Sequence, residues 1–161
     1  MKVVNLPRLL ARLELHRSRG HFVVFTNGCF DILHVGHLRT LQDARAQGDL
    51  LIVGVNSDAS VRAIKGPTRP VNSQDDRAEL LGGLACVDYV VFFEESTPLE
   101  LLGKVRPDVH VKGGDYQISD LPEARLVQSY GGRVHLSALI PGRSTTALLE
   151  SVGGGVPSAG G

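Results

Sequence analysis

Two histidines and a glycine stand at the start of a predicted helix in the stretch TNGCFDILHVGHLRTL, residues 26–41. His34 and His37 are three residues apart, so both imidazoles lie on one face of the first helical turn, on either side of Gly36. A helix N-terminus presents unpaired backbone N–H groups and the positive end of the helix dipole, which favour an anion. A side chain at Gly36 would keep a phosphate away from the backbone. The stretch therefore predicts a phosphate-binding turn.

An alternative interpretation is a pair of ordinary surface histidines. For a single histidine that interpretation would be the better one, but a pair around a glycine at a strand-to-helix turn favours function. Imidazoles placed there can donate hydrogen bonds to phosphate oxygens, and these bonds help most where they strengthen in the transition state. The sequence contains neither a GxxxxGK[ST] loop nor a GxGxxG fingerprint, so the two commonest other nucleotide-binding motifs are excluded.

The elements that must position this turn alternate between strand and helix. The predicted strands are His21–Thr26, Leu50–Val55, Val87–Phe93, Val109–Lys112 and Arg133–Ala138. The predicted helices are Asn5–Arg19, Gly36–Ala46, a short one ending at Ile64, Ser73–Leu84, one from Ser96 or Thr97 to Val105, Pro122–Tyr130, and a last short one at Ser144. Apolar runs of this kind suit strands buried on both faces, and no hairpin signal occurs. We predict an α/β Rossmann-like fold, with a five-stranded parallel sheet, helices on both faces and ligands at the carboxyl ends of the strands.

Composition favours a single soluble domain. We assign residues 1–152 to one domain, with an opening amphipathic helix in residues 1–20, and residues 153–161 to a flexible Gly-rich tail. The 17 basic residues equal the 17 acidic ones, which argues against nucleic acid or a membrane surface as a partner. The apolar runs are strand-sized and the two cysteines match no zinc spacing, so we expect a cytoplasmic protein with reduced thiols.

Residues 26–41 closely resemble the GxFDxxHxGH signature of the cytidylyltransferase-like nucleotidyltransferases, with Phe30, Asp31, His34, Gly36 and His37 in place. Within that superfamily the chain is most similar to the adenylyltransferase domain of bifunctional ADP-heptose synthases. The resemblance runs from about residue 22 to residue 149 and includes VNSDASVRAIKGPTRPVN, VDYVVFFEESTP, VKGGDY and STT. It supports the same fold class as the pattern of elements.

The resemblance also implies roles for individual residues. The catalytic residues would be His34, His37 and Lys65, with Lys65 in a mobile loop reaching the α-phosphate. The nucleotide would contact Thr26, Asn27, Gly28, Cys29, Phe30, Gly36, Lys112, Gly113, Asp115, Ser144, Thr145 and Thr146. Asp31 and Arg77 would face the acceptor. Many family members place a basic residue shortly after the hydroxyls that correspond to residues 144–146. Here Ala147 follows them, and the nearest cation is Arg143.

The implied reaction transfers AMP from ATP to a sugar 1-phosphate, heptose 1-phosphate, and gives an ADP-sugar and pyrophosphate. Mg²⁺ would enter with ATP and need no direct protein ligand, and the chain would form a homodimer. Three alternatives remain open: a CTP-dependent enzyme acting on a polyol phosphate or a phosphoalkanolamine, an FMN adenylyltransferase, and a nucleotide-binding module without catalysis.

Overall fold

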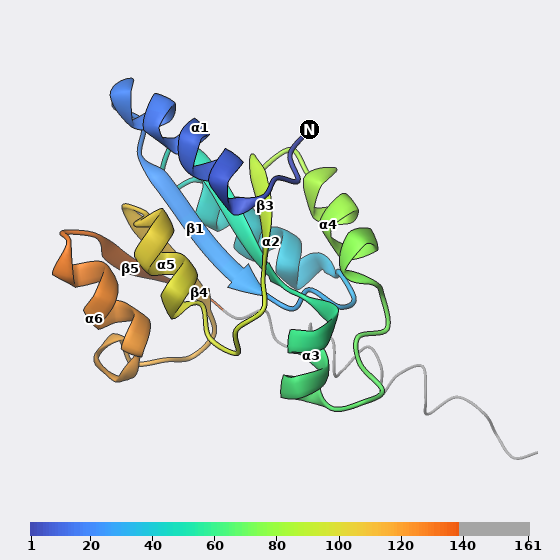
Figure 1. Ribbon diagram of the computed structural model, residues 1–161. Coiled ribbons are helices and arrows are strands. Elements are labelled where there is room, and N and C mark those ends of the chain that lie inside the picture. The colour runs from blue at the N-terminus through green and yellow to red at the C-terminus, as the bar shows by residue number, and fades with distance from the viewer. Residues whose placement is uncertain (139–161) are drawn as a thin grey trace, which may run out of the picture.

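A five-stranded parallel sheet forms the centre of the protein in the computed structural model, which describes residues 1–138 (Figure 1). The strands are β1 (Val23–Gly28), β2 (Leu50–Asn56), β3 (Tyr89–Phe93), β4 (Val109–Gly113) and β5 (Arg133–Ser137). Their spatial order is β3-β2-β1-β4-β5, and every neighbouring pair is parallel. The predicted fold class is confirmed. The predicted last helix, the hydroxyl-bearing residues 144–146 and the tail 153–161 lie outside the described residues.

Helices cover both faces of the sheet, as Figure 1 shows. One face packs against α1 (Leu6–Ser18), α5 (Leu99–Val105) and α6 (Pro122–Ser129), and the other against α2 (Val35–Arg45) and α4 (Gln74–Gly82). The remaining elements are α3 (Asp58–Lys65), which follows β2, and a short 3₁₀ turn, η1 (Ile118–Asp120).

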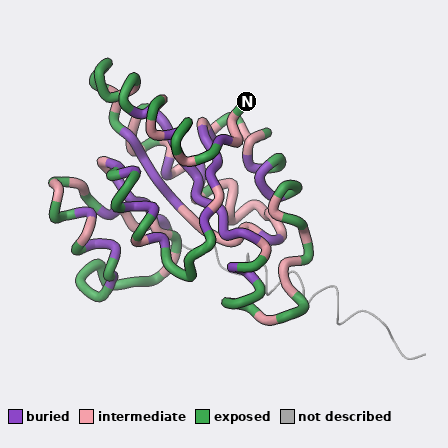
Figure 2. The backbone as a smooth tube through the Cα atoms, viewed as in Figure 1, coloured by how far each residue is buried: buried purple, intermediate pink, exposed green. Residues whose placement is uncertain are grey.

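Strand side chains alternate between two separate hydrophobic cores. Val23 and Phe25 belong to the core under α1, α5 and α6, whereas Val24 belongs to the core under α2 and α4. Figure 2 shows the result as buried backbone running through the middle of the sheet. Because both faces are covered, the strands read as continuous apolar runs in the sequence.

The elements differ from the predicted ones mainly at their ends. β1 starts two residues later than predicted and runs on to Gly28, because Asn27 and Gly28 continue the pairing with β2. α3 includes Lys65, which we had placed in the following loop; the helix ends at Gly66, whose φ of 103° favours glycine. α5 begins only at Leu99, after Pro98 at its N-cap.

β1 and β4 pair over a short length only. Their register joins Val24 to Val109 and Phe25 to His110, and the backbone ladder does not continue toward the carboxyl ends. Beyond that point the Thr26 hydroxyl donates to the carbonyl of Val111 at 2.8 Å. β2 and β3 lie on one side of β1 in the sheet, whereas β4 and β5 lie on the other side. Parallel sheets bind ligands at such a switch point, at the carboxyl ends of the strands.

The N-terminal segment runs alongside the outer edge of β3. The Val4 N–H donates to the Val90 carbonyl at 3.0 Å, and the Val90 N–H donates to the Lys2 carbonyl at 2.9 Å. Val3 forms a parallel bridge with the same residue. Three residues of backbone therefore cover part of this edge strand.

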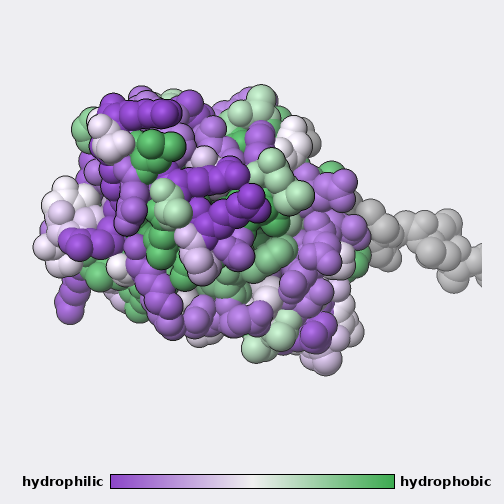
Figure 3. Space-filling view, turned by 45° about the horizontal axis from the view of Figure 1, so that its top comes forward, coloured by the Kyte–Doolittle hydropathy of each residue, from purple (hydrophilic) through white to green (hydrophobic). Residues whose placement is uncertain are grey.

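The surface of the molecule is mostly polar on the face that Figure 3 presents, with apolar side chains scattered among hydrophilic ones. Within residues 1–138, no helix is long and apolar enough to cross a membrane.

Candidate functional site

The two histidines of the signature form a reciprocal cap at the N-terminus of α2. His34 is the N-cap residue, and its Nδ1 accepts a hydrogen bond from the Gly36 N–H at 3.0 Å. His37 Nδ1 accepts one from the His34 N–H at 3.3 Å. The two rings are close, with centroids 3.9 Å apart. This is the arrangement of a capping box, built here from histidines instead of Ser and Glu.

The cap fixes the protonation pattern of both rings. A neutral imidazole whose Nδ1 accepts a hydrogen bond carries its proton on Nε2, so each ring is a hydrogen-bond donor at Nε2. Burial, helped by the neighbouring His34 and Lys65, lowers the pKa of His37 from 6.5 to about 4. His37 is therefore neutral at physiological pH and can offer a hydrogen bond to an anion beside the positive end of the helix dipole.

The turn between β1 and α2 wraps around the ring of Phe30. Phe30 has a φ of 47°, in the left-handed region, and its ring packs edge-on against His37 with centroids 5.3 Å apart. The ring also lies over Gly28, where an added Cβ would be 3.1 Å from Phe30 Cε2. Phe30 thus supports His37, and Gly28 leaves room for the aromatic ring.

Lys65 approaches this turn from α3. Its side chain is exposed, and its charge lies close enough to lower the pKa of both His37 and Cys29. The Cys29 thiol donates weakly to Asn56 Oδ1 at 3.8 Å, and burial raises its pKa, so the thiol stays protonated. Lys65 therefore lies close enough to the turn to act on His37, its phosphate contact stays a prediction, and Cys29 lacks the thiolate that a nucleophile needs.

Asp31 is buried and anchors the loop that follows α3. Its carboxylate is only 1% exposed and accepts hydrogen bonds from Arg69 Nε at 2.5 Å, from the Val71 N–H at 2.8 Å and from the Asn72 N–H at 3.0 Å. Burial opposes ionisation, but the bonds from Asn72, Val71 and Arg69 outweigh it and lower the pKa of Asp31. Asp31 was predicted to face the acceptor, and the structure instead uses both of its carboxylate oxygens internally.

Arg77 joins several elements beneath the same turn. The residue is 1% exposed, and its guanidinium donates to the carbonyls of Cys29 at 2.6 Å, Asn56 at 2.8 Å and Asn72 at 3.1 Å. It also pairs with Asp58 at 2.9 Å. We had placed Arg77 at the acceptor, but its side chain is covered and held by backbone of the turn, the end of β2 and the loop.

The predicted residues on the other side of the switch point come from β1 and β4. His110 Nε2 donates to Asn27 Oδ1 at 3.2 Å, and Lys112 pairs with Glu123 of α6 at 3.6 Å. Lys112 also lies over the ring of Tyr116, 4.9 Å from its centroid. Gly113 and the exposed Asp115 follow at the end of β4. The end of β4 lies against α2, since a Cβ added at Gly113 would be 3.5 Å from Thr40 Cγ2.

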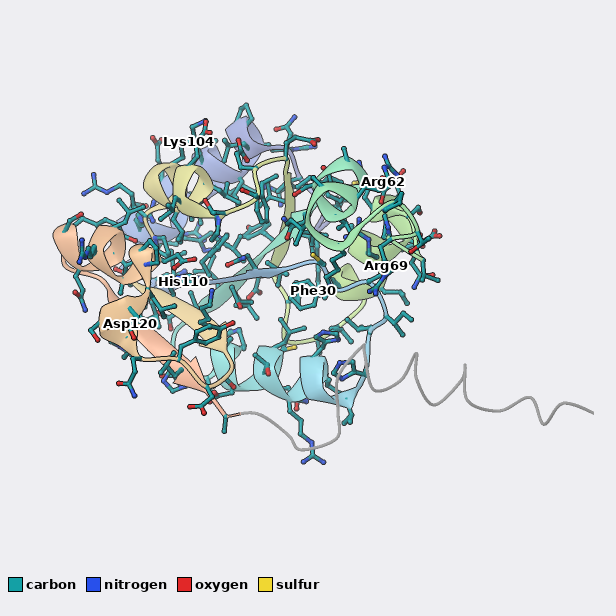
Figure 4. All side chains as sticks on the ribbon, turned by 90° about the horizontal axis from the view of Figure 1, so that it is seen from below. Phe30, Arg62, Arg69, Lys104, His110 and Asp120 are labelled. Atoms are coloured by element: carbon teal, nitrogen blue, oxygen red, sulfur yellow. The ribbon has the colours of Figure 1, made fainter. Side chains whose placement is uncertain are left out.

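Figure 4 looks onto the carboxyl ends of the strands, with Phe30 and Arg69 on one side and His110 toward the other. Of the remaining predicted residues, Ser144, Thr145 and Thr146 lie outside the described part of the chain. Within the described part, no group of three or more His, Cys, Asp and Glu side chains is arranged to hold a metal ion.

Three residues at this site were missed by sequence reasoning. Arg69 and Asn72 bind Asp31, and His110 binds Asn27. Arg69 and Asn72 belong to the stretch KGPTRPVN, which carries part of the family resemblance, so that stretch was the available signal. His110 gave none, because it alternates with valines in a strand and resembles an ordinary sheet histidine.

Comparison with protein families and known proteins agrees with this geometry. The model of the cytidylyltransferase-like family matches residues 25–141. The bifunctional protein HldE of Syntrophotalea carbinolica is 58% identical over 140 residues, which are 87% of this chain and 29% of the relative. That of Pseudomonas aeruginosa strain LESB58 is 54% identical over 150 residues, 93% of this chain and 32% of the relative. The chain thus spans about three tenths of the length of these relatives.

Solved structures show the same fold. The lipopolysaccharide core biosynthesis protein from Thermoplasma volcanium superposes with a TM-score of 0.61 at 28% identity, over 75% of this chain and 98% of that chain. Pantoate-beta-alanine ligase from Francisella tularensis superposes with a TM-score of 0.62 at 16% identity, over 91% of this chain and 69% of that chain. The second likeness concerns the fold alone.

Proposed function

Because the chain belongs to the cytidylyltransferase-like family of nucleotidyltransferases, we propose that it transfers AMP from ATP to a sugar 1-phosphate, with heptose 1-phosphate as the acceptor. The observation that carries the proposal is the pair of neutral histidines at the N-terminus of α2, each with its donor at Nε2. The choice of acceptor is supported by the likeness to the HldE proteins and to a lipopolysaccharide core biosynthesis protein.

In the proposed reaction, an oxygen of the acceptor phosphate attacks the α-phosphorus of ATP in line. The new P–O bond forms as the bond to the bridging oxygen of pyrophosphate breaks, and the electron pair leaves with pyrophosphate. No covalent bond to the protein is needed, since the acceptor phosphate is already a nucleophile. The work of the protein is therefore positioning and charge stabilisation.

Each residue of the turn has a part in that work. His34 and His37 donate from Nε2 to oxygens of the nucleotide phosphates, with the α2 dipole behind them. Lys65 places a positive charge near His37, beside the α-phosphorus where negative charge grows. The proposed contacts of residues 26–30, 112, 113 and 115 would hold the nucleoside along the ends of β1 and β4.

We propose that Mg²⁺ enters with ATP, where it would neutralise charge between phosphate oxygens. The donor set fits an ion held by the phosphates, because Asp31, the carboxylate nearest the histidines in sequence, is occupied by Arg69 and two backbone N–H groups. The residues 144–146 are proposed to contact the same phosphates.

A screen of nucleotides against acceptors, read as pyrophosphate release, tests the proposal. ATP and CTP are each paired with heptose 1-phosphate, a polyol phosphate, a phosphoalkanolamine and FMN. The proposal expects release with ATP and heptose 1-phosphate, and loss of that signal in His37→Ala but not in His21→Ala, which makes the same change at the amino end of β1. Pyrophosphate release only in the CTP pairings, or only with ATP and FMN, would identify one of the alternative enzymes. ATP-dependent thermal stabilisation without any release would identify a binding module.

We further propose that the protein is a cytoplasmic homodimer. Sedimentation equilibrium of the purified chain tests the oligomeric state, for which a monomer of 17.2 kDa is the other outcome.

A further inference from the structure

The guanidinium of Arg69 is only half used by the protein. Its Nε donates to Asp31 at 2.5 Å, while its Nη2 is buried and has no hydrogen-bond partner among residues 1–138. Its side chain is 16% exposed, so the group is largely removed from water. A buried donor on a charged group without a partner costs free energy, and in a native structure such a group calls for an explanation.

Asp31 cannot supply the missing partner. A guanidinium and a carboxylate commonly pair through two parallel hydrogen bonds. Here the second carboxylate oxygen, Oδ1, already accepts from the Val71 N–H at 2.8 Å and from the Asn72 N–H at 3.0 Å. Asp31 therefore fixes the position of Arg69 and leaves the Nη1–Nη2 edge for another acceptor. That edge matches two oxygens of a phosphate group.

The charges around Arg69 favour an anion. Lys65, Arg69 and Arg77 all lie close enough to Cys29 to lower its pKa, and Asp31 lies close enough to raise it. Asp31 and Asp58 pair with Arg69 and Arg77, which leaves the charge of Lys65 unbalanced within this group. The cluster is thus positive before the α2 dipole is counted.

Lys65 and Arg69 both act on the turn between β1 and α2. Lys65 influences both His37 and Cys29, whereas Arg69 contributes at Cys29. Figure 4 shows Arg69 beside Phe30, at the same end of the strands as the turn. The Nη1–Nη2 edge of Arg69 therefore offers a second position for a phosphate, besides the one at the histidines of α2.

We propose that Arg69 binds the phosphate monoester of the acceptor through its Nη1–Nη2 edge. The proposal rests on the proposed function, since it assigns the second phosphate of that reaction. It makes Arg69 a residue that selects phosphorylated acceptors, and gives Asp31 the task of holding Arg69 in place.

Steady-state kinetics with Arg69→Lys and Arg69→Met test this assignment. Lysine keeps a positive charge to pair with Asp31 but lacks the planar two-donor edge. We expect KM for the sugar phosphate to rise at least ~10-fold in both variants, which corresponds to one charge-assisted contact, while KM for ATP changes less than ~2-fold. Arg62→Met is the matched control, because it removes an exposed cation from α3 and should leave both constants unchanged. If KM for the sugar phosphate and KM for ATP both rose in the Arg69 variants, and rose in the same way in Asp31→Asn, Arg69 would only anchor the loop. That result would overturn the proposal.

Binding of inorganic phosphate separates this inference from the proposed reaction. Phosphate is titrated calorimetrically into the wild-type protein, Arg62→Met and Arg69→Lys in the absence of nucleotide. The inference expects heat of binding in the first two and at least ~10-fold weaker binding in the third. Absent transferase activity with this pattern of binding would overturn the reaction and leave the phosphate site standing. Equal binding in all three proteins would overturn the site, whatever their activity.

Discussion

In each of the two imidazoles at the start of α2, Nδ1 and Nε2 have different roles. Nδ1 of each ring accepts a backbone N–H and holds the turn. In the proposed reaction the proton on Nε2 binds a phosphate oxygen. Structure and chemistry can therefore be separated by substitutions that imitate one nitrogen at a time. An asparagine places a polar atom near the position of Nδ1, and a glutamine places its amide near the position of Nε2.

Asparagine and glutamine at His37 should accordingly fail in opposite ways. His37→Asn keeps an acceptor for the His34 N–H and loses the donor, so we expect the stability of the protein to hold and turnover to fall by about 10²–10³-fold. His37→Gln restores a donor, and we expect at least ~10-fold more turnover than in His37→Asn, with a lower melting temperature. Turnover numbers and thermal denaturation of the two variants measure this. Equal turnover in both variants would contradict the assigned role of Nε2.

Asp31 and Arg77 make contacts inside the protein that the sequence did not suggest. Both were predicted at the acceptor, because charged residues in a motif suggest ligand contacts. The fold instead buries them, and nothing in the residue types reveals that the N–H groups of Val71 and Asn72 converge on Asp31. The buried Asp31 also holds Arg69 in position, and Arg69 is a residue that the sequence did not single out.

At the scale of elements, the alternation of strand and helix was predictable because each apolar run is long enough to cross one buried layer. The ends were less predictable, because pairing with neighbours decides them. β1 continues through Asn27 and Gly28 since β2 offers Gly54 and Val55 as partners. Gly54 itself is required by packing, as a Cβ there would lie 2.8 Å from Phe25 Cζ. Such contacts come from residues distant in sequence, which local patterns do not contain.

Arg77 is the point at which α4, α3 and the β1–α2 turn are held together. Arg77→Met should lower the free energy of unfolding by about 3–5 kcal/mol, because it leaves Asp58 and three carbonyls without their buried partner. Urea denaturation at neutral pH measures the loss. Glu79→Met, an exposed position on the same helix, is the control and should change stability by less than about 0.5 kcal/mol. A loss below 1 kcal/mol in Arg77→Met would contradict its role as a link between these elements.

At the scale of the whole molecule, the stability of the protein should depend on pH through its buried histidines. Burial, partly offset by Glu123 and assisted by Lys112, lowers the pKa of His110 from 6.5 to about 4. In the unfolded chain the same group titrates near its ordinary value. The folded state therefore binds fewer protons between these two values, so stability is complete above about pH 6.5 and falls as the pH drops toward 4.

The contribution of His110 can be isolated by substitution. It amounts to at most about 3 kcal/mol between pH 7 and pH 4. His110→Gln keeps a donor for Asn27 and cannot titrate, so we expect its free energy of unfolding to fall less steeply than that of the wild-type protein over this range. Urea denaturation at several pH values gives both curves. Parallel curves would contradict a neutral buried His110, while the remaining slope in the variant reports on groups such as His37.

The site as a whole was predictable in outline and not in detail. Placing His34, His37 and Lys65 near one another required only that strand ends meet at one edge of a parallel sheet. The early end of the β1–β4 ladder, which joins only Val24 to Val109 and Phe25 to His110, could not be predicted. The length of a ladder is a tertiary property that periodicity does not encode.

The three residues that run along β3 have a consequence for self-association. An open edge strand offers unpaired N–H and C=O groups to any other extended chain, and edge-to-edge pairing is a route to aggregation. Here the backbone of Lys2 and Val4 already occupies the hydrogen-bonding positions of Val90 on that edge. The first few residues therefore act as a guard strand, which leaves Val90 no free backbone group for a neighbouring molecule to pair with.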